Sequence, residues 1–217
     1  MKIETLEFAG VRSALHAMRN PMDSWAKGDT TYHLTTEDYP EEPFPTTIDF
    51  LMGENDKDLS SRLQKAGPEH AKHLRMVMVW ADITAPRYWW NEFDTYRAGV
   101  EKVSCSTMHR MMARELLPGD FEGCNDHCYS GQLLETMDYI NTMIAAYKAS
   151  TDPEEKRIIW EYVIQILPQS YRQKRTVMMS YAALRNIYRQ REGHKLNEWH
   201  QFRAWVESLP ESWMITE

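Results

Sequence analysis

The chain has 217 residues, is 42% hydrophobic and carries a formal net charge of -7, which suits a single globular domain over residues 1–217. The acidic balance argues against bulk binding of nucleic acid through the phosphate backbone, and the lack of any run of 18 apolar residues argues against a membrane span. The first ten residues also lack a basic stretch followed by an apolar one, so we expect no signal peptide and a cytoplasmic protein.

The chain begins with a predicted strand and a short helix. Residues 2–9 alternate in hydrophobicity in places and are followed by Gly10, which predicts a strand. A short helix is expected over residues 11–19. Residues 20–47 are rich in Pro, Asp and Thr, which indicates a loop or an extended arm.

Two helices are expected between this arm and the next strand. Asn55 and Asp56 are expected to cap the first, and Gly67-Pro68 ends it. A second helix is expected through residues 69–74. The apolar run at residues 76–80 fits either the end of that helix or a buried strand, because periodicity alone does not distinguish them.

Two helices with clear start signals follow a loop in the middle of the chain. The Gly and Pro content of residues 118–130 predicts the loop, and Ser130 is expected to cap a helix that extends to Tyr147. Asp152-Pro153 combines a capping side chain with Pro in the first turn, so a second helix begins there. Its expected apolar face consists of Ile158, Ile159, Tyr162, Val163 and Ile166.

The end of the chain is expected to be helical. A long helix is predicted over residues 170–191, and Gly193 marks its end. Trp199, Phe202 and Val206 form one face of a last helix that ends near Pro210. Strands are thus expected mainly in the first half, which predicts an α+β fold with a mixed or antiparallel sheet flanked by helices and a helix-rich C-terminal half.

A local basic region stands out in this acidic chain. No Asp or Glu occurs between Glu161 and Glu192, and this acid-free window contains Arg172, Lys174, Arg175, Arg185, Arg189 and Arg191. Guanidinium groups pair with phosphate in a bidentate way, so an anionic ligand is one interpretation. The alternatives are a solvated helix face and ion pairs with acidic helices of another subunit.

The segment from Ile83 to His109 carries a dense mixture of aromatic and polar residues. It resembles the flavin-dependent thymidylate synthases, which have a strand ending in Ala-Pro, a helix ending in Gln-x-x-Arg-His-Arg, and a stretch Asn-Glu-x-Ser-x-Arg-Tyr. The matching positions, without gaps, are Ala85-Pro86 at Ala-Pro, Glu92 at the Gln, Thr95-Tyr96-Arg97 at Arg-His-Arg, Cys105 at the Ser, and Thr107-Met108 at Arg-Tyr.

A second block resembles the same family. Its members have Leu-Pro and later a helix reading Asn-x-Arg-x-x-x-His/Asn that ends in an Arg. Here Leu167-Pro168 matches, and the later positions are Ser180 at the Asn, Ala182 at the Arg, Asn186 at the His/Asn, and Arg191 at the last Arg. The resemblance covers about residues 76–109 and 158–191.

The resemblance implies an enzyme that transfers a one-carbon unit to C5 of a pyrimidine deoxynucleotide, dUMP or a related nucleotide. It also implies FAD as cofactor, NADPH and methylenetetrahydrofolate as co-substrates, and a homotetramer. Several family side chains are replaced in this chain, for example by Ala182 and Cys105. The alternative is therefore a non-catalytic or flavin-free nucleotide-binding or structural homologue on the same fold.

Residue roles also follow from the resemblance. Arg191 is implied as the catalytic group that stabilises negative charge developing on the pyrimidine ring. The implied flavin contacts are Thr95, Tyr96, Arg97, Glu101, Ser180 and Asn186. The implied substrate contacts are Glu92, Ser104, Cys105, Ser106, Thr107 and Arg191.

The chain has three cysteines, Cys105, Cys124 and Cys128, and such a low and odd number does not indicate a disulfide framework. Cys105 is a candidate nucleophile, although the family chemistry needs none from the enzyme. Cys124, His127 and Cys128 lie within five residues and offer zinc ligands, with free thiols in a surface loop as the alternative. Because a second ligand pair is missing, we assign no metal.

Overall fold

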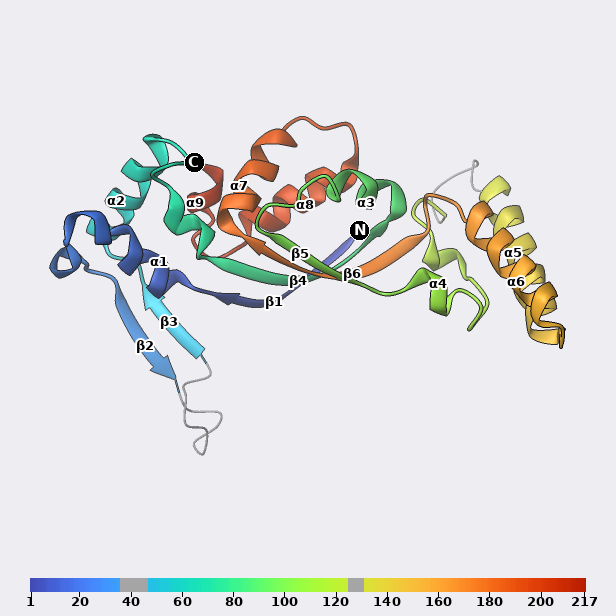
Figure 1. Ribbon diagram of the computed structural model, residues 1–217. Coiled ribbons are helices and arrows are strands. Elements are labelled where there is room, and N and C mark those ends of the chain that lie inside the picture. Colours follow the sequence, from blue (N-terminus) through green and yellow to red (C-terminus); the bar gives the residue numbers. More distant parts are fainter. Residues whose placement is uncertain (36–46, 125–130) are drawn as a thin grey trace. The chain divides into compact units, whose positions relative to one another are not determined.

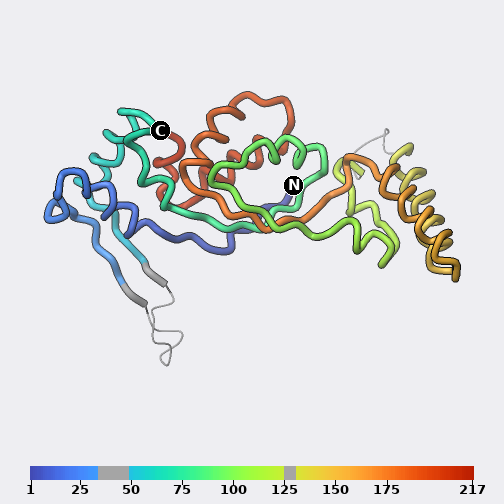
Figure 2. Tube along the Cα trace, viewed as in Figure 1, coloured from blue at the N-terminus to red at the C-terminus, as the bar shows by residue number. Residues whose placement is uncertain are grey.

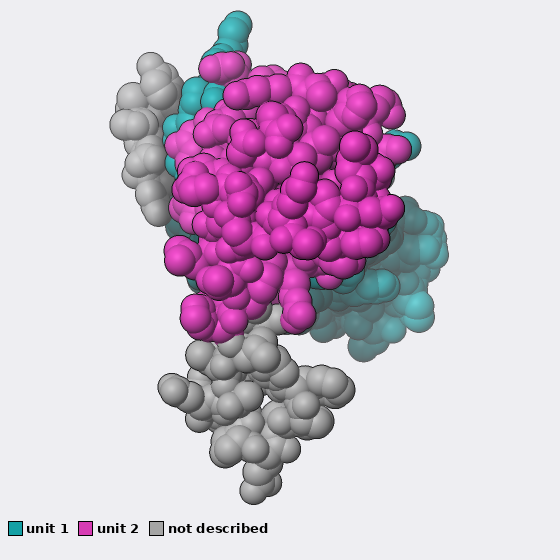
Figure 3. Space-filling view, turned by 90° about the vertical axis from the view of Figure 1, so that its left-hand side faces the viewer, with its two compact units in different colours: residues 1–6, 80–178, 193–205 teal, residues 7–79, 179–192, 206–217 magenta. Residues whose placement is uncertain are grey.

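The structure is a computed structural model that describes residues 1–35, 47–124 and 131–217. Two compact units are present (Figure 3). Unit 1 comprises residues 1–6, 80–178 and 193–205, and unit 2 comprises residues 7–79, 179–192 and 206–217. The chain therefore passes between the units several times. In the described part of the chain, no helix is long and apolar enough to cross a membrane.

Four strands form the main sheet, in the order β1-β4-β6-β5 (Figure 1). They are β1 (Lys2–Ala9), β4 (Met78–Pro86), β5 (Val100–Ser104) and β6 (Arg172–Ser180). The predicted first strand is confirmed, and the apolar run at residues 76–80 leads into strand β4. The expected fold class is also confirmed, because an antiparallel sheet is flanked by helices in a mixed α+β structure.

The predicted long helix over residues 170–191 is wrong in its first half. Residues 172–180 form β6, and helix α7 (Tyr181–Gln190) begins only after it. The end of β6 has the period-two burial of a strand, since Val177 and Met179 are fully buried while Met178 between them is half-buried. The cationic residues at its start obscured this pattern in the sequence.

Unit 1 contains an aromatic core built from two helices. Helix α3 (Arg87–Phe93) follows β4 directly, and helix α8 (Asn197–Glu207) begins in this unit. The ring centroid of Trp89 lies 4.9 Å from that of Trp199 and 5.8 Å from that of Phe202, and all three side chains are fully buried. The predicted helix and its apolar face are thereby confirmed, although it is not the last helix, because the short helix α9 (Trp213–Thr216) follows it.

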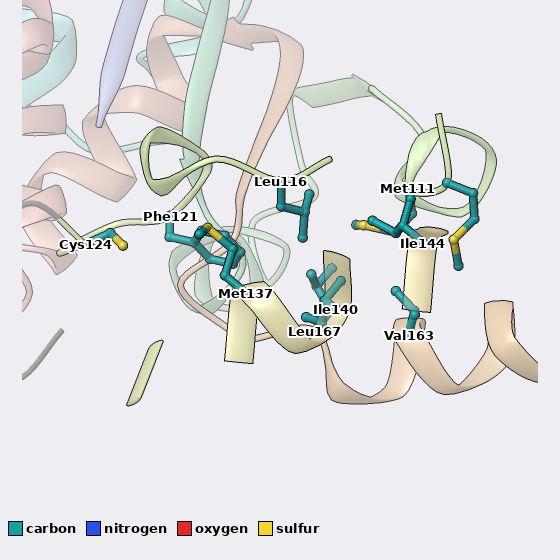
Figure 4. Close-up of a cluster of buried hydrophobic side chains, with 10 residues drawn as sticks. Met111, Leu116, Phe121, Cys124, Met137, Ile140, Ile144, Val163 and Leu167 are labelled. Atoms are coloured by element: carbon teal, nitrogen blue, oxygen red, sulfur yellow. The ribbon is translucent and has the colours of Figure 1, made fainter. Parts of the chain in front are cut away.

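A second hydrophobic cluster of unit 1 lies at helices α5 (Gly131–Ala149) and α6 (Pro153–Ile166) (Figure 4). Short helices α4 (Thr107–Arg110) and η4 (Pro118–Asp120) precede α5. The predicted start of α6 is confirmed, because the Asp152 carboxylate accepts a hydrogen bond from the Glu154 N–H at 2.9 Å. Of its predicted apolar face only Val163 is fully buried, and Ile158 and Tyr162 are exposed.

Unit 2 combines short helices with a two-stranded antiparallel sheet, β2 (Thr31–Thr35) and β3 (Thr47–Leu51). These strands run side by side in Figures 1 and 2. The prediction of a loop or arm over residues 20–47 therefore missed β2, which lies inside this range. The helical elements are α1 (Val11–Met18), η1 (Asn20–Met22), η2 (Trp25–Lys27), α2 (Glu54–Lys65), η3 (Lys72–Arg75), α7 and α9 (Trp213–Thr216).

Helix α2 is present as predicted, but its cap differs. The Asp29 carboxylate, distant in sequence, accepts hydrogen bonds from the N–H groups of Asn55 at 2.9 Å and Asp56 at 3.1 Å. The two residues expected to cap the helix lie inside its first turn instead. The second helix predicted over residues 69–74 is only the short 3-10 helix η3.

Candidate functional site

Glu92 lies in the last turn of α3 and its carboxylate is held inside unit 1. Its Oε2 atom accepts a hydrogen bond from Trp199 Nε1 at 2.9 Å and lies 3.3 Å from His194 Nε2. The partners come from α8 and the segment before it, and no sequence pattern predicts either contact. Glu92 is therefore fixed in direction, as a recognition side chain needs to be.

The Thr95-Tyr96-Arg97 triplet lies in the turn that follows α3. The Thr95 hydroxyl donates to the Glu92 carbonyl oxygen at 2.7 Å. The Tyr96 ring packs against Trp199 with a centroid distance of 6.2 Å. Arg97 is exposed, and its guanidinium forms no ion pair with any residue of the described part of the chain. The triplet thus offers an aromatic face and an accessible cation.

Residues 104–107, here called the 104–107 segment, connect β5 to α4. The Cys105 N–H donates to the Lys174 carbonyl oxygen at 2.9 Å, which extends the pairing of β5 with β6 by one residue. The Ser106 hydroxyl oxygen caps α4 by accepting from the His109 N–H at 3.2 Å. Ser104 and Cys105 are exposed, so the segment is accessible to a ligand.

Gln173 on β6 holds this segment, and sequence reasoning did not single it out. Its Nε2 donates to the Cys105 carbonyl oxygen at 2.9 Å and lies 3.3 Å from the Thr107 hydroxyl oxygen. Its Oε1 accepts from Arg175 Nε at 3.0 Å, and its backbone carbonyl accepts from Trp90 Nε1 at 2.9 Å. Both Nε2 and Oε1 of the Gln173 side-chain amide are therefore hydrogen-bonded.

Arg175 is held in turn by an aromatic ring and a carboxylate. Its guanidinium carbon lies 4.3 Å from the centroid of the Trp90 ring, a cation–π contact. Its Nη1 is 2.8 Å from Asp94 Oδ1, which also pairs with Lys102 Nζ at 2.8 Å. Burial opposes ionisation of Asp94, but the hydrogen bonds from Lys102 and Arg175 outweigh it and keep the pKa of this carboxyl below its ordinary value.

Three cations of the acid-free window are used in ion pairs of unit 1. Arg172 pairs with Glu122 at 3.0 Å, Lys174 pairs with Asp82, and Arg175 pairs with Asp94. Ion pairs thus account for the first half of the window, but their acids belong to the same chain, whereas the sequence interpretation placed them on helices of another subunit. An anion site built from all six cations is not supported by these contacts.

Of the remaining predicted site residues, Glu101 is exposed on β5 in unit 1, and the others lie on α7 or at its ends in unit 2. Ser180 is 3% exposed and caps the helix by accepting from the Ala183 N–H at 3.2 Å. Asn186 is exposed and its Oδ1 accepts from Gln190 Nε2 at 2.9 Å. Arg191 is the residue directly after the last turn and is half-buried. Burial, and then the neighbouring Arg189, lower the pKa of Arg185 on the same helix.

The fold can be compared with known proteins. No protein-family model and no curated protein matches the chain. Two crystal structures of thymidylate synthase X (ThyX) from Helicobacter pylori, each with FAD and dUMP, do match it along its whole length. The first has a TM-score of 0.69 at 16% identity, and the second has 0.68 at 15%; both cover 100% of this chain and 98% of the other.

The chain has the fold of the flavin-dependent thymidylate synthases. The likeness to ThyX includes residues 76–109 and 158–191, which carry the sequence resemblance. Within them, β4 ends at Ala85-Pro86 and α3 follows at once, which confirms the predicted order of a strand and a helix. Identity this low establishes the fold alone.

The cysteines give no metal centre within the described residues. Cys105 is an exposed free thiol and Cys124 a buried one. No group of three or more His, Cys, Asp or Glu side chains in the described segments is arranged to hold a metal ion. His127 and Cys128, the other members of the suggested zinc site, lie outside the described residues.

Proposed function

We propose that the chain is a flavin-dependent thymidylate synthase-like enzyme that transfers a one-carbon unit to C5 of a pyrimidine deoxynucleotide, dUMP or a close relative. The observation that carries this proposal is the full-length likeness to two structures that contain FAD and dUMP. The exposed Ser104 and Cys105 and the accessible Arg97 support it, because they offer groups to an anionic nucleotide.

The proposed roles of individual residues follow the two blocks of the sequence resemblance. Arg191 is the proposed catalytic group, since a guanidinium stabilises negative charge that develops on a pyrimidine ring when its C5 is made nucleophilic. The proposed substrate contacts are Glu92, Ser104, Cys105, Ser106, Thr107 and Arg191. Cys105 contributes recognition in this proposal and is not assigned as a nucleophile.

FAD is the proposed cofactor, and when bound it supplies hydride chemistry that side chains cannot perform. The accessible Arg97 guanidinium and the exposed Asn186 amide fit a flavin nucleotide, because one suits a phosphate and the other a polar ring edge. The proposed cofactor contacts are Thr95, Tyr96, Arg97, Glu101, Ser180 and Asn186. NADPH and methylenetetrahydrofolate are the proposed co-substrates, and a homotetramer is the proposed assembly.

A flavin-free nucleotide-binding homologue is the second candidate, and two hydrogen bonds favour it. The Ser180 hydroxyl oxygen already accepts from the Ala183 N–H, and the Thr95 hydroxyl already donates to the Glu92 carbonyl oxygen. Each group thus has part of its hydrogen-bonding capacity occupied within the protein. The same nucleotide contacts would then serve binding without redox chemistry.

Two titrations of the purified protein test these candidates. Binding of dUMP is measured by calorimetry, and uptake of FAD by its visible absorbance after gel filtration. Uptake of about one FAD per chain together with dUMP binding is the result expected for the enzyme. Binding of dUMP by a protein that takes up no FAD would favour the flavin-free homologue. Failure to bind either ligand would overturn both candidates.

A substitution tests the role of Arg191. We expect Arg191→Ala to abolish dUMP binding, because a charged recognition contact is lost. The matched control is Arg62→Ala, which removes an exposed guanidinium on α2 that pairs with Asp58. Unchanged dUMP affinity in Arg191→Ala would remove this residue from the proposed site.

A further inference from the structure

A cavity in unit 2 is lined by no residue assigned to the proposed site. It has a volume of about 180 Å³ and is lined by helix α1, by the segment that follows it, by Tyr32 of β2 and by Asp56 of α2. This volume is below the range of about 300–1,000 Å³ typical of pockets for drug-sized ligands. The cavity therefore suits a ligand of about one ring.

One wall of this cavity is a stacked pair of flat rings. The His16 and Trp25 rings lie 5.8 Å apart between centroids, with an angle of 13° between their planes. The Trp25 side chain is 45% exposed, although an indole of this size is normally buried. Its Nε1 donates to Asn20 Oδ1 at 2.8 Å, which fixes the ring in this position. The stacked pair is thus a rigid and accessible apolar face.

The one acid of the lining, Asp56, has no free acceptor for a ligand. Its Oδ1 lies 2.6 Å from Arg19 Nη2 and 2.8 Å from Arg19 Nε. Its Oδ2 accepts from the Thr30 hydroxyl at 2.7 Å and from the Thr30 N–H at 3.1 Å. Burial opposes ionisation, but the hydrogen bonds from Thr30 and Arg19 outweigh it and keep the pKa of Asp56 below its ordinary value. The carboxylate is ionised, and its charge is cancelled by Arg19.

Two guanidinium groups give the cavity a positive balance. Arg12 is exposed, stands 5.5 Å over the Tyr32 ring and pairs with no carboxylate within the described residues. Arg19 is 4% exposed and uses Nε and Nη2 on a single oxygen of Asp56, while Nη1 makes only a 3.4 Å contact with the Ser24 carbonyl. A guanidinium has five N–H donors, so Arg19 retains donor capacity.

We propose that this cavity is a binding site for a small planar organic anion, namely one aromatic or heteroaromatic ring that carries a carboxylate or a phosphate. The ring lies against Trp25, since flat π-systems stack on indole. The anionic group is held by Arg12, whose positive charge has no counterpart in the cavity. The Arg12 guanidinium lies over the face of the Tyr32 ring, and this cation–π contact holds it in place.

Ligand-observed saturation-transfer NMR with the full chain tests the site. The probes are benzoate, nicotinate, phenyl phosphate, inorganic phosphate and cyclohexanecarboxylate, the last being an anion without a planar ring. We expect the three aromatic anions to bind, and cyclohexanecarboxylate and inorganic phosphate to bind at least about tenfold more weakly because they cannot stack. The stronger of benzoate and phenyl phosphate identifies the preferred anionic group.

Two substitutions of exposed residues locate the binding. Arg12→Gln and Trp25→Leu should each weaken benzoate binding by about tenfold, because one removes the charge and the other the stacking face. The control is Arg62→Gln, an equal charge change at an exposed position of α2 outside the cavity. Arg191→Ala should leave benzoate binding unchanged, which separates this site from the proposed nucleotide site.

Three results would overturn the proposal. The first is the absence of saturation transfer to every aromatic anion, and the second is equal binding of benzoate and cyclohexanecarboxylate. The third is full benzoate affinity in both Arg12→Gln and Trp25→Leu. Circular dichroism of each variant confirms that it is folded, and a third exposed substitution, His16→Ala, repeats the test of the stacked pair if Trp25→Leu does not fold.

Discussion

The Gln173 side-chain amide donates to the Cys105 carbonyl oxygen at 2.9 Å and so joins β6 to the 104–107 segment. Its other end accepts from Arg175 Nε at 3.0 Å, and Arg175 is itself fixed by the Trp90 ring and Asp94. The conformation of the proposed nucleotide contacts thus depends on a residue that no sequence motif marks. Gln173 acts as a positioning residue in this arrangement.

Replacing Gln173 should weaken nucleotide binding without unfolding the protein. Gln173→Leu removes the bond to the Cys105 carbonyl and the contact with Thr107, each worth about 1 kcal/mol, so we expect the dissociation constant for dUMP to rise by up to about thirtyfold. Gln173→Glu keeps an acceptor for Arg175 but lacks the donor to Cys105, and it should show the same loss. Calorimetry measures both.

The matched control is Gln169→Leu. Gln169 is likewise a glutamine of unit 1, although exposed where Gln173 is half-buried, and its Oε1 accepts from Asn91 Nδ2 at 3.3 Å, away from the 104–107 segment. Wild-type affinity is expected for this variant. Full affinity in Gln173→Glu would show that the Gln173 donor has no positioning role.

The features that were predictable from the sequence depend on neighbours along the chain. The start of α6 was predictable because Asp152 caps it two residues away, a local hydrogen bond with a known residue preference. The face of α8 formed by Trp199, Phe202 and Val206 followed from helical spacing. The order of β4 and α3 followed from the resemblance at Ala85-Pro86.

The missed features depend on partners far away in the sequence. The strand β6 begins with charged residues that are satisfied by distant acids, as in the ion pair of Arg175 with Asp94, 81 positions earlier. The cap of α2 comes from Asp29, 26 positions before Asn55. Gln173 is likewise 68 positions from Cys105. Neither composition nor periodicity contains information on such contacts, so only the fold reveals them.

Ser180 is proposed as a cofactor contact, and its capping bond predicts an independent effect on stability. Ser180→Ala should lower the free energy of unfolding by about 1 kcal/mol, because the Ala183 N–H loses its acceptor in a buried position. Denaturant unfolding followed by circular dichroism measures this. Ser180→Thr retains a hydroxyl and should recover most of the loss; equal stability of Ser180→Ala and the wild type would contradict the capping role.

The buried ion pair between Arg19 and Asp56 predicts a larger effect. Asp56→Ala leaves the buried Arg19 guanidinium without its counter-charge and the backbone N–H groups of Asp29 and Thr30 without an acceptor, so the free energy of unfolding should fall by about 3–5 kcal/mol. The control is Asp58→Ala, since Asp58 forms an exposed ion pair with Arg62 whose loss should cost less than about 1 kcal/mol. Similar unfolding free energies for the two variants would refute the structural role of Asp56.

His73 predicts how stability depends on pH. Its Nε2 lies 2.8 Å from the Ser60 hydroxyl oxygen and it is 3% exposed; burial, and then Arg185, lower the pKa of His73 from 6.5 to about 4. Between these values the unfolded chain binds a proton that the folded chain does not. The free energy of unfolding should therefore fall as the pH falls from 6.5 to 4, by at most about 3 kcal/mol.

His73→Gln should flatten this part of the curve of unfolding free energy against pH, whereas His70→Gln, at an exposed position, should not. Denaturant unfolding at a series of pH values measures the slope, and an unchanged slope in His73→Gln would exclude His73 as its source.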